Sequence, residues 1–219
     1  MTHFAATAVV AEQRGSPLSR IPAAERRAAL AHAAMAVIAR DGVAAATTRA
    51  IVAEAGMPLA SFHYAVGSRD ELLSDVIELV VAGEGSATLG SLEIDAPDLR
   101  SAVRATFGAY LDLVRSDPAR EQAMFELTQH ALRTPALADL PRQQYDSYHR
   151  LAAQLLASGA QRYGADWDLP IDDLARFVIA VTDGFTLSWL ADRDDAAAER
   201  LLDLATDALM AHTLNGAPA

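Results

Sequence analysis

Apolar residues recur at helical spacing along most of this sequence, and that periodicity restricts the fold more than any other feature. In residues 22–40 they stand at Leu30, Ala34, Val37 and Ile38, an i, i+4, i+7, i+8 pattern typical of an amphipathic helix. No stretch of more than a few residues alternates apolar and polar side chains as a strand does. The sequence therefore predicts an all-α fold of about nine helices.

Glycines and capping residues divide this pattern into separate helices. Gly42, Gly56 and Gly67 follow three of the early segments, and Ser68 with Glu71 forms a capping box at the start of the next. A loop of small residues is expected from Gly83 to Pro97. The predicted helices cover residues 22–40, 49–55, 58–65, 69–82, 98–115, 118–132, 139–163, 170–191 and 195–212.

Composition excludes several classes of protein. The sequence has 52% hydrophobic residues, too many for a disordered chain, and no cysteine, which excludes disulfides, thiolate catalysis and cysteine-ligated metals. No stretch of 18 residues is apolar and free of charged side chains, so no membrane span is expected. The first residues lack the pattern of a signal peptide. We therefore expect a cytoplasmic protein without membrane contact.

Charge is divided unevenly along the chain. The formal net charge is −11, and all 18 basic residues are arginine. Residues 1–69 hold seven arginines against four acids, for +3, whereas residues 70–219 hold eleven arginines against 25 acids, for −14. Only the N-terminal third is therefore suited to approach phosphates.

Two short predicted helices in that third, joined through Ala55-Gly56-Met57, are typical of a helix-turn-helix. In this motif the second helix lies in the major groove of DNA, which admits one helix. Small or hydrogen-bonding side chains should form its exposed face: Leu59, Ala60, Ser61, His63 and Tyr64. Ile51, Ala55, Phe62 and Val66 should hold the two helices together.

Residues beside the second helix are candidates for phosphate contacts, and Arg69 begins a helix whose N-terminus also favours anions. These candidates are Thr47, Thr48, Arg49, Tyr64 and Arg69. The alternative is that Thr47 and Ser68 only cap helices and that Arg49 and Arg69 are solvated charges.

The residue types strengthen the DNA-binding hypothesis. Residues 47–58 (TTRAIVAEAGMP), 60–64 (ASFHY) and 67–73 (GSRDELL) resemble the DNA-binding domain of TetR-family repressors. Arg26-Arg27 through Val43 is similar to the first helix of that family. Pro58 stands where the family has a Ser or Thr cap, which leaves the start of the recognition helix open.

Residues 173–177 (DLARF), 183–185 (DGF) and 189–190 (WL), followed by a capped final helix, are similar to the last two helices of the BetI-like branch. In that branch the last two helices of each subunit pair in a four-helix dimer interface. The residues that this resemblance implies are Phe177, Val178, Val181, Phe185, Leu201, Leu204, Ala208 and Leu209. The alternative is that they cover the chain's own core. A symmetric homodimer would also match a palindromic operator on double-stranded DNA.

The resemblance further implies a small organic effector among the middle helices. Aromatic residues with a few polar ones suit such a ligand: Phe107, Tyr110, Phe125, Gln129, His130, Tyr145, Tyr148, His149 and Trp189. The alternative is that they are ordinary core or surface residues.

No catalytic or metal-binding motif is present, so neither an enzyme nor a metal or other cofactor is expected. The expected organisation is a flexible arm at residues 1–20, a DNA-binding domain at 21–68, a connecting helix at 69–82, and a ligand-binding and dimerisation domain at 83–219. The hypothesis is a ligand-responsive TetR-type transcriptional repressor. The alternative is a helical, dimeric protein-interaction module that has lost DNA binding.

Overall fold

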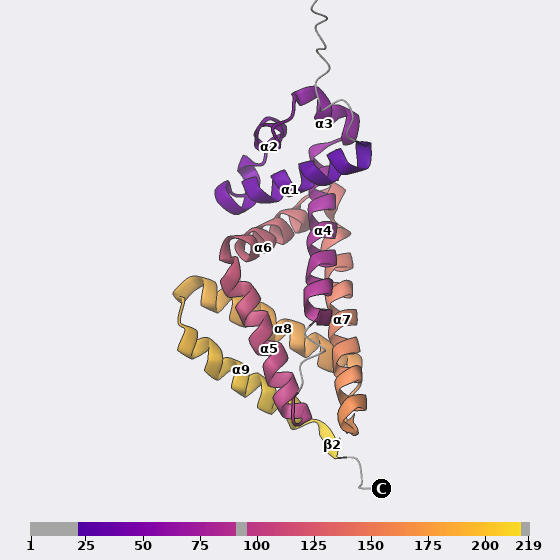
Figure 1. Cartoon of the computed structure of the whole chain (residues 1–219), viewed down its shortest axis with the longest axis vertical. Helices are drawn as coiled ribbons and strands as arrows, with labels where there is room; N and C mark the ends of the chain where they lie inside the picture. Colours follow the sequence, from indigo (N-terminus) through magenta and orange to yellow (C-terminus); the bar gives the residue numbers. More distant parts are fainter. Residues whose placement is uncertain (1–21, 91–95, 216–219) are drawn as a thin grey trace, which may run out of the picture.

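The computed structural model describes residues 22–90 and 96–215, and these contain nine α-helices in two packed groups (Figure 1). The all-α prediction is confirmed. The predicted arm at residues 1–20 lies outside the described residues. The helices are α1 (Ala23–Asp41), α2 (Thr48–Glu54), α3 (Leu59–Ala65), α4 (Arg69–Gly90), α5 (Leu99–Ser116), α6 (Pro118–Arg133), α7 (Leu140–Tyr163), α8 (Ile171–Asp192) and α9 (Asp195–Met210).

Short elements complete the described chain. The 3-10 turns η2 (Val43–Ala45) and η4 (Pro135–Leu137) follow α1 and α6. The strands β1 (Ala165–Trp167) and β2 (Thr213–Asn215) pair antiparallel and join the end of α7 to the chain after α9. Three-residue strands are too short for a period-two pattern to be recognised, so sequence periodicity does not predict them.

The predicted end of the fourth helix at residue 82 is wrong, because α4 continues to Gly90. The prediction depends on the small residues after Gly83. A glycine inside a helix costs only about 1 kcal/mol relative to alanine, which is too little to end a helix by itself. α4 therefore runs from the upper helix group towards the lower one, beside α7 (Figure 1).

The upper group consists of α1, α2, α3 and the first half of α4, and one side of α6 completes its core. Leu30, Ile51, Phe62 and Leu72 are fully buried there. Arg27 joins α1 to α4 because its Nε and Nη2 donate to the two carboxylate oxygens of Asp75 at 2.6 and 2.8 Å. This bidentate contact fixes the helix on which the short helices α2 and α3 rest.

The lower group is a second core formed by α5, α7, α8 and α9. Phe107 and Leu111 of α5 pack there with Phe185 of α8 and with Leu202 and Leu209 of α9. Aspartates cap the starts of α5 and α9, since Asp98 and Asp194 accept the backbone N–H groups of Ser101 and Ala197.

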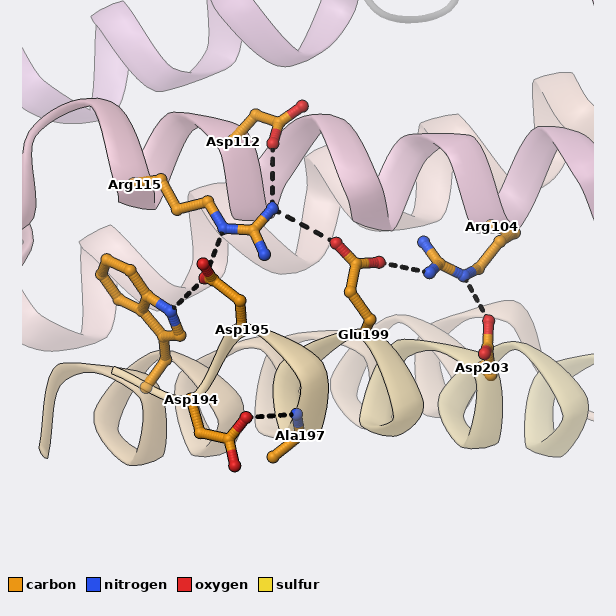
Figure 2. A network of polar contacts seen from close by, with 9 residues as sticks. Arg104, Asp112, Arg115, Asp194, Asp195, Ala197, Glu199 and Asp203 are labelled. Atoms are coloured by element: carbon orange, nitrogen blue, oxygen red, sulfur yellow. Dashed lines mark hydrogen bonds and ion pairs between the residues drawn. The ribbon is translucent and has the colours of Figure 1, made fainter. Parts of the chain in front are cut away.

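Ion pairs attach α9 to α5 along one side of the lower group (Figure 2). Arg104 of α5 contacts Glu199 at 2.5 Å and Asp203 at 2.6 Å. Arg115 contacts Asp195 at 2.9 Å and Glu199 at 3.2 Å, so Glu199 bridges the two arginines. A shared network of this kind fixes the position of α9 better than isolated surface pairs would.

α8 is the one helix in the described chain with the length and hydropathy of a membrane span. Apolarity of this degree is also common in core helices of globular proteins. Here α8 packs against α7 on one side and α9 on another, and Leu174, Phe185 and Trp189 are buried in the lower core.

Candidate DNA-binding surface and ligand pocket

The segment from α2 to α3 forms a tight helix-turn-helix. Gly56 adopts the left-handed conformation (φ 63°) that turns the chain after α2, a conformation that favours glycine. Met57 then donates its N–H to the carbonyl oxygen of Val52 at 2.8 Å. Ile51 and Phe62 are buried between the helices, as predicted, and Val66 is buried at the end of α3.

α3 presents its other side to solvent. Leu59, Ala60, His63 and Tyr64 are exposed, with Tyr64 reaching 81%, while Ser61 is half-buried. α3 begins at Leu59, and Pro58 takes the N-cap position with extended backbone (φ −69°, ψ 149°). The exposed side is thus a short row of small and polar side chains with one aromatic residue, which fits a groove that admits one helix.

The start of α2 lies at the edge of this surface. The side chain of Thr47 caps α2 by accepting the N–H of Ala50 at 3.2 Å. Thr48 is half-buried, and Arg49 is exposed on the first turn. Arg49 can therefore approach a phosphate without breaking an internal contact.

Arg69 differs from Arg49 because its guanidinium group points into the protein. Its Nε donates to the carbonyl oxygen of Ala46 at 2.8 Å, and its Nη2 donates to that of Val43 at 2.6 Å. The alternative of an ordinary solvated charge does not describe this side chain, and the phosphate contact expected of Arg69 stays a prediction. Arg69 holds the turn between α1 and α2 against the start of α4.

A cavity of about 480 Å³ lies in the lower half of the molecule, between α5, α6, α7 and α8. This is the size of many small-molecule sites. Its walls are mainly apolar and aromatic. Five of the predicted ligand-binding residues line it: Phe107, Tyr110, Phe125, Tyr145 and Tyr148.

The other four predicted residues do not line the cavity. Gln129 is exposed on the outer side of α6. Trp189 is buried in the lower core, and its indole N–H donates to Asp195 at 2.9 Å. His130 and His149 are half-buried beside the cavity rather than in its wall. Helical rotation explains these errors, because neighbours in sequence point about 100° apart on a helix.

Two hydrogen-bonded groups of polar side chains lie in the cavity wall, and their members Thr128, Gln144 and Asp183 are not predicted from the sequence. In the first, Thr128 donates its hydroxyl to Gln144 Oε1 at 3.2 Å, and Gln144 Nε2 donates to the hydroxyl of Tyr148 at 3.0 Å. In the second, the hydroxyl of Tyr145 donates to Asp183 at 2.6 Å. Gln144 and Tyr148 are four residues apart, which is one helical turn. This spacing is visible in the sequence and is the signal that could have placed Gln144 beside Tyr148.

Burial shifts the pKa values of Asp183 and Tyr145, which form the second group, and of the neighbouring His149. Desolvation raises the pKa of Asp183, and the hydrogen bond from Tyr145 only partly offsets this effect. Desolvation and the same carboxylate raise the pKa of Tyr145. Desolvation, assisted by the positive charge of Arg176, lowers the pKa of the neighbouring His149.

α8 and α9 also carry an exposed, mainly apolar stripe. It consists of Phe177, Ala180, Gly184, Leu187 and Ser188 on α8 and of Leu201, Leu204 and Ala208 on α9. Four predicted interface residues belong to this stripe, namely Phe177, Leu201, Leu204 and Ala208.

The prediction of partner contacts for Phe185 and Leu209 is wrong. Each is 1% exposed and packs in the lower core of its own chain, so neither can contact a second subunit. Val178 and Val181 are half-buried against the same core.

α6 belongs to both halves of the molecule. Ala123 and Leu127 lie in the upper core, whereas Met124 and Phe125 line the cavity. The Glu126 carboxylate also accepts the backbone N–H of Val43 at 2.8 Å. A single helix therefore contacts both the cavity and the turn that precedes the helix-turn-helix.

Two family descriptions match the chain. Residues 30–76 match the family described as bacterial regulatory proteins, tetR family. Residues 99–214 match the family described as BetI-type transcriptional repressor, C-terminal. The first match spans the helix-turn-helix, and the second spans the cavity and the α8–α9 stripe.

Similar proteins cover almost the whole chain. The nicotine-responsive transcriptional repressor HdnoR of Paenarthrobacter nicotinovorans is 30% identical over 195 residues, which are 87% of this chain and 97% of the relative. A structure assigned as a transcriptional regulator from Pseudomonas aeruginosa PAO1 has a TM-score of 0.71 and 23% identity, covering 89% of this chain and 95% of that one. A regulator from Saccharomonospora viridis in complex with choline has a TM-score of 0.67 and 22% identity, covering 87% and 98%.

Proposed function

The chain belongs to the TetR family of bacterial regulatory proteins, and from this premise we propose that it is a homodimeric repressor which a small organic effector releases from a palindromic operator. The family consists of transcriptional regulators, and we infer that this chain has no enzymatic activity and needs no metal or other cofactor. It acts where its operator lies, in the cytoplasm.

The exposed side of α3 supports the assignment of the DNA-reading surface. We assign base contacts to Leu59, Ala60, Ser61, His63 and Tyr64, and phosphate contacts to Thr47, Thr48 and Arg49. Arg69 contributes mainly as a positioning residue, because two of its nitrogens are held by backbone carbonyl groups. The observation that carries the proposal is the row of solvent-facing side chains on α3, supported by a fixed turn at Gly56.

The two packed groups support a division of labour. We propose that residues 21–68 form the DNA-reading head, that α4 connects it to the rest, and that the part from residue 83 onward binds the effector and dimerises. The exposed stripe on α8 and α9 would pair with the same stripe of a second copy, since an apolar helix face of this extent favours burial. The symmetric pair would place two α3 helices on successive half-sites.

The cavity supports a small organic effector. Its aromatic walls and few polar groups suit such a ligand. The similar repressor from Paenarthrobacter nicotinovorans is named for its response to nicotine, and the structure from Saccharomonospora viridis holds choline. Effector binding would favour a dimer in which the α3 helices no longer match the operator, and a coupling of about 1–3 kcal/mol would weaken binding roughly 5–150-fold.

The proposal is tested by DNA binding. The full-length protein is titrated by fluorescence anisotropy against the DNA that flanks its own gene, at two salt concentrations, with fragments selected genome-wide as a second target. We expect tight, competitor-resistant binding that weakens with salt. Tyr64→Ala removes an assigned base contact and should weaken binding by about 1–3 kcal/mol, whereas Arg49→Ala removes a phosphate contact and should weaken binding to all sequences and reduce the salt slope by about 1.

Arg150→Ala is the matched control, because Arg150 lies in α7 outside the proposed DNA surface and is exposed like Arg49. It removes one positive charge and should leave operator affinity within about twofold. Failure to bind any genomic fragment in a salt-dependent way would reject the proposal and favour a protein-interaction module. Equal operator affinity of the Tyr64, Arg49 and Arg150 variants would reject the assigned surface.

A further inference from the structure

The cavity wall contains a carboxylate for which the described residues provide a hydrogen bond but no ion pair. Asp183 of α8 accepts a hydrogen bond from the hydroxyl of Tyr145, and in the described part of the chain it forms no ion pair. Glu121, the other carboxylate in the cavity wall, contacts Arg120 Nη1 at 2.9 Å. Among the described residues that line the cavity, Asp183 alone therefore presents an unbalanced negative charge.

Three other charged or titratable side chains lie near the cavity, namely His149, Arg162 and Arg176, and none of them forms an ion pair with Asp183. Desolvation and the positive charge of Arg176 lower the pKa of His149 and so disfavour its cationic form, although Asp146 and Asp183 act in the opposite direction. Arg162 lines the cavity but follows Tyr145 by 17 positions on α7, which at 1.5 Å per residue places it about 25 Å along the helix. The half of the cavity nearest Tyr145 is thus electronegative.

Aromatic side chains line the cavity beside Asp183 and elsewhere. Tyr145 and Tyr148 of α7 pack edge to face, with ring centroids 5.8 Å apart, and Tyr110 and Phe125 line the same cavity. Aromatic faces attract cations through the ring quadrupole, more strongly where water is excluded. A buried carboxylate also costs free energy unless a positive charge pairs with it. Both features favour the same class of ligand.

We propose that the effector is an organic monocation, an amine or quaternary ammonium with an apolar body, and that Asp183 is its counter-ion. The inference rests on the proposed function of the cavity as the effector site. Binding would bring the positive charge to the carboxylate between α7 and α8 and place the apolar body against the aromatic walls. Tyr145 holds the Asp183 carboxylate in place by its hydrogen bond.

The test compares charged probes with uncharged probes of the same shape. Benzyltrimethylammonium and 1-methyl-4-phenylpyridinium are paired with neopentylbenzene and 4-methylbiphenyl, and biphenyl-4-carboxylate serves as the anion. Dissociation constants for the full-length protein are measured by calorimetry or by thermal shift. We expect at least one cation to bind tenfold or more tightly than its neutral partner, and the anion to bind weakest.

Variants test whether Asp183 provides the negative charge to which the cationic probes bind. Asp183→Asn should weaken the favoured cation at least tenfold and leave its neutral partner within twofold. Asp173→Asn, which removes an exposed carboxylate from the first turn of the same helix, should change neither. Because Asn still accepts the hydrogen bond from Tyr145, the Asp183 variant is expected to fold.

The outcomes separate this inference from the proposed function. Equal binding of cation and neutral partner, an unchanged cation affinity in the Asp183→Asn protein, or no binding of any cation overturns the inference. If the neutral or anionic probes instead bind and release operator DNA, the repressor function stands and only the ligand class is wrong. If the cations bind through Asp183 but operator affinity does not respond, the ligand class stands and the effector response is rejected.

Discussion

At the scale of single residues, two aspartates of neighbouring helices illustrate opposite effects of environment. Asp183 lies in the cavity wall, where desolvation raises its pKa. Asp195 begins α9, where hydrogen bonds from Trp189 and Arg115 lower its pKa. The first carboxylate therefore opposes folding when ionised, and the second supports it.

The directions of the two pKa shifts predict how the stability of the fold depends on pH. With its folded-state pKa above the ordinary 3.8, Asp183 binds a proton more readily in the folded chain, so its ionisation lowers stability as pH rises through that pKa. Asp183→Asn should therefore raise the melting temperature at pH 7, and the gain should vanish as pH falls towards 3.8. A shift of about 2–4 °C would correspond to 1 kcal/mol in a chain of this size.

Asp195→Asn is the matched comparison with the opposite sign. Its folded-state pKa lies below 3.8, so the ionised carboxylate stabilises the fold above that pH and the contribution is lost in more acidic solution. The variant should melt below the parent at pH 7 and approach it under acidic conditions. Melting curves from pH 3 to pH 8 that shift in the same direction for both variants would contradict the opposite roles of the two carboxylates.

Residue type and spacing are sufficient to predict part of the candidate sites, namely the exposed row on α3 and five cavity residues. They do not indicate the direction of the Arg69 guanidinium, which depends on where the carbonyl groups of Val43 and Ala46 come to lie. Asp183 escapes prediction for the same reason, because only the packing of α7 on α8 brings it to Tyr145.

At the scale of helices, the stripe on α8 and α9 is the feature that one chain does not explain. Leu204 is 65% exposed and Leu187 is 52% exposed, although both stand among apolar neighbours. The start of α6 at Pro118 is predicted correctly, and Asp117 caps it by accepting the N–H of Arg120. The side of α8 that faces away from the core is predicted less well. The helix is so apolar that its sides differ little in hydrophobicity.

Replacement of Leu204 by Asp should separate the proposed dimer. In a symmetric interface each substitution occurs twice, and burial of one leucine contributes about 1.5–3 kcal/mol, so the dimer dissociation constant should rise roughly 10²–10⁴-fold. Sedimentation or light scattering measures the change. Leu132→Asp, at a 59% exposed leucine of α6, is the control and should leave the assembly intact. A Leu204→Asp protein that stays dimeric would place the interface elsewhere.

At the scale of the whole molecule, α6 and Glu126 connect the two halves. Ala123 and Leu127 complete the upper core, Phe125 lines the cavity, and Glu126 binds the backbone of Val43. We therefore expect a ligand that displaces α6 to shift the turn that precedes α2 as well. Sequence patterns do not reveal this connection, because residues 43 and 126 are far apart along the chain and belong to different predicted domains.

Glu126→Ala should loosen that connection without disturbing the cavity. Loss of a charged acceptor for the Val43 N–H should cost about 1–2 kcal/mol of unfolding free energy and accelerate amide hydrogen exchange around residues 42–47. Exchange in α7 and α8 should stay unchanged. Glu126→Gln keeps an acceptor oxygen and should lose less. Equal exchange near Val43 in all three proteins would show that this contact does not couple the halves.

The existence of two separate cores has a consequence for how such a protein can evolve. Substitutions that reshape the cavity walls on α5, α7 and α8 are absorbed by the lower core, where they leave the packing around Ile51 and Phe62 intact. New ligand preferences can therefore arise while the operator stays the same, and the reverse holds for changes on α3. α6 is the exception, since its residues contact both the upper core and the cavity. We expect substitutions in α6 to be tolerated least.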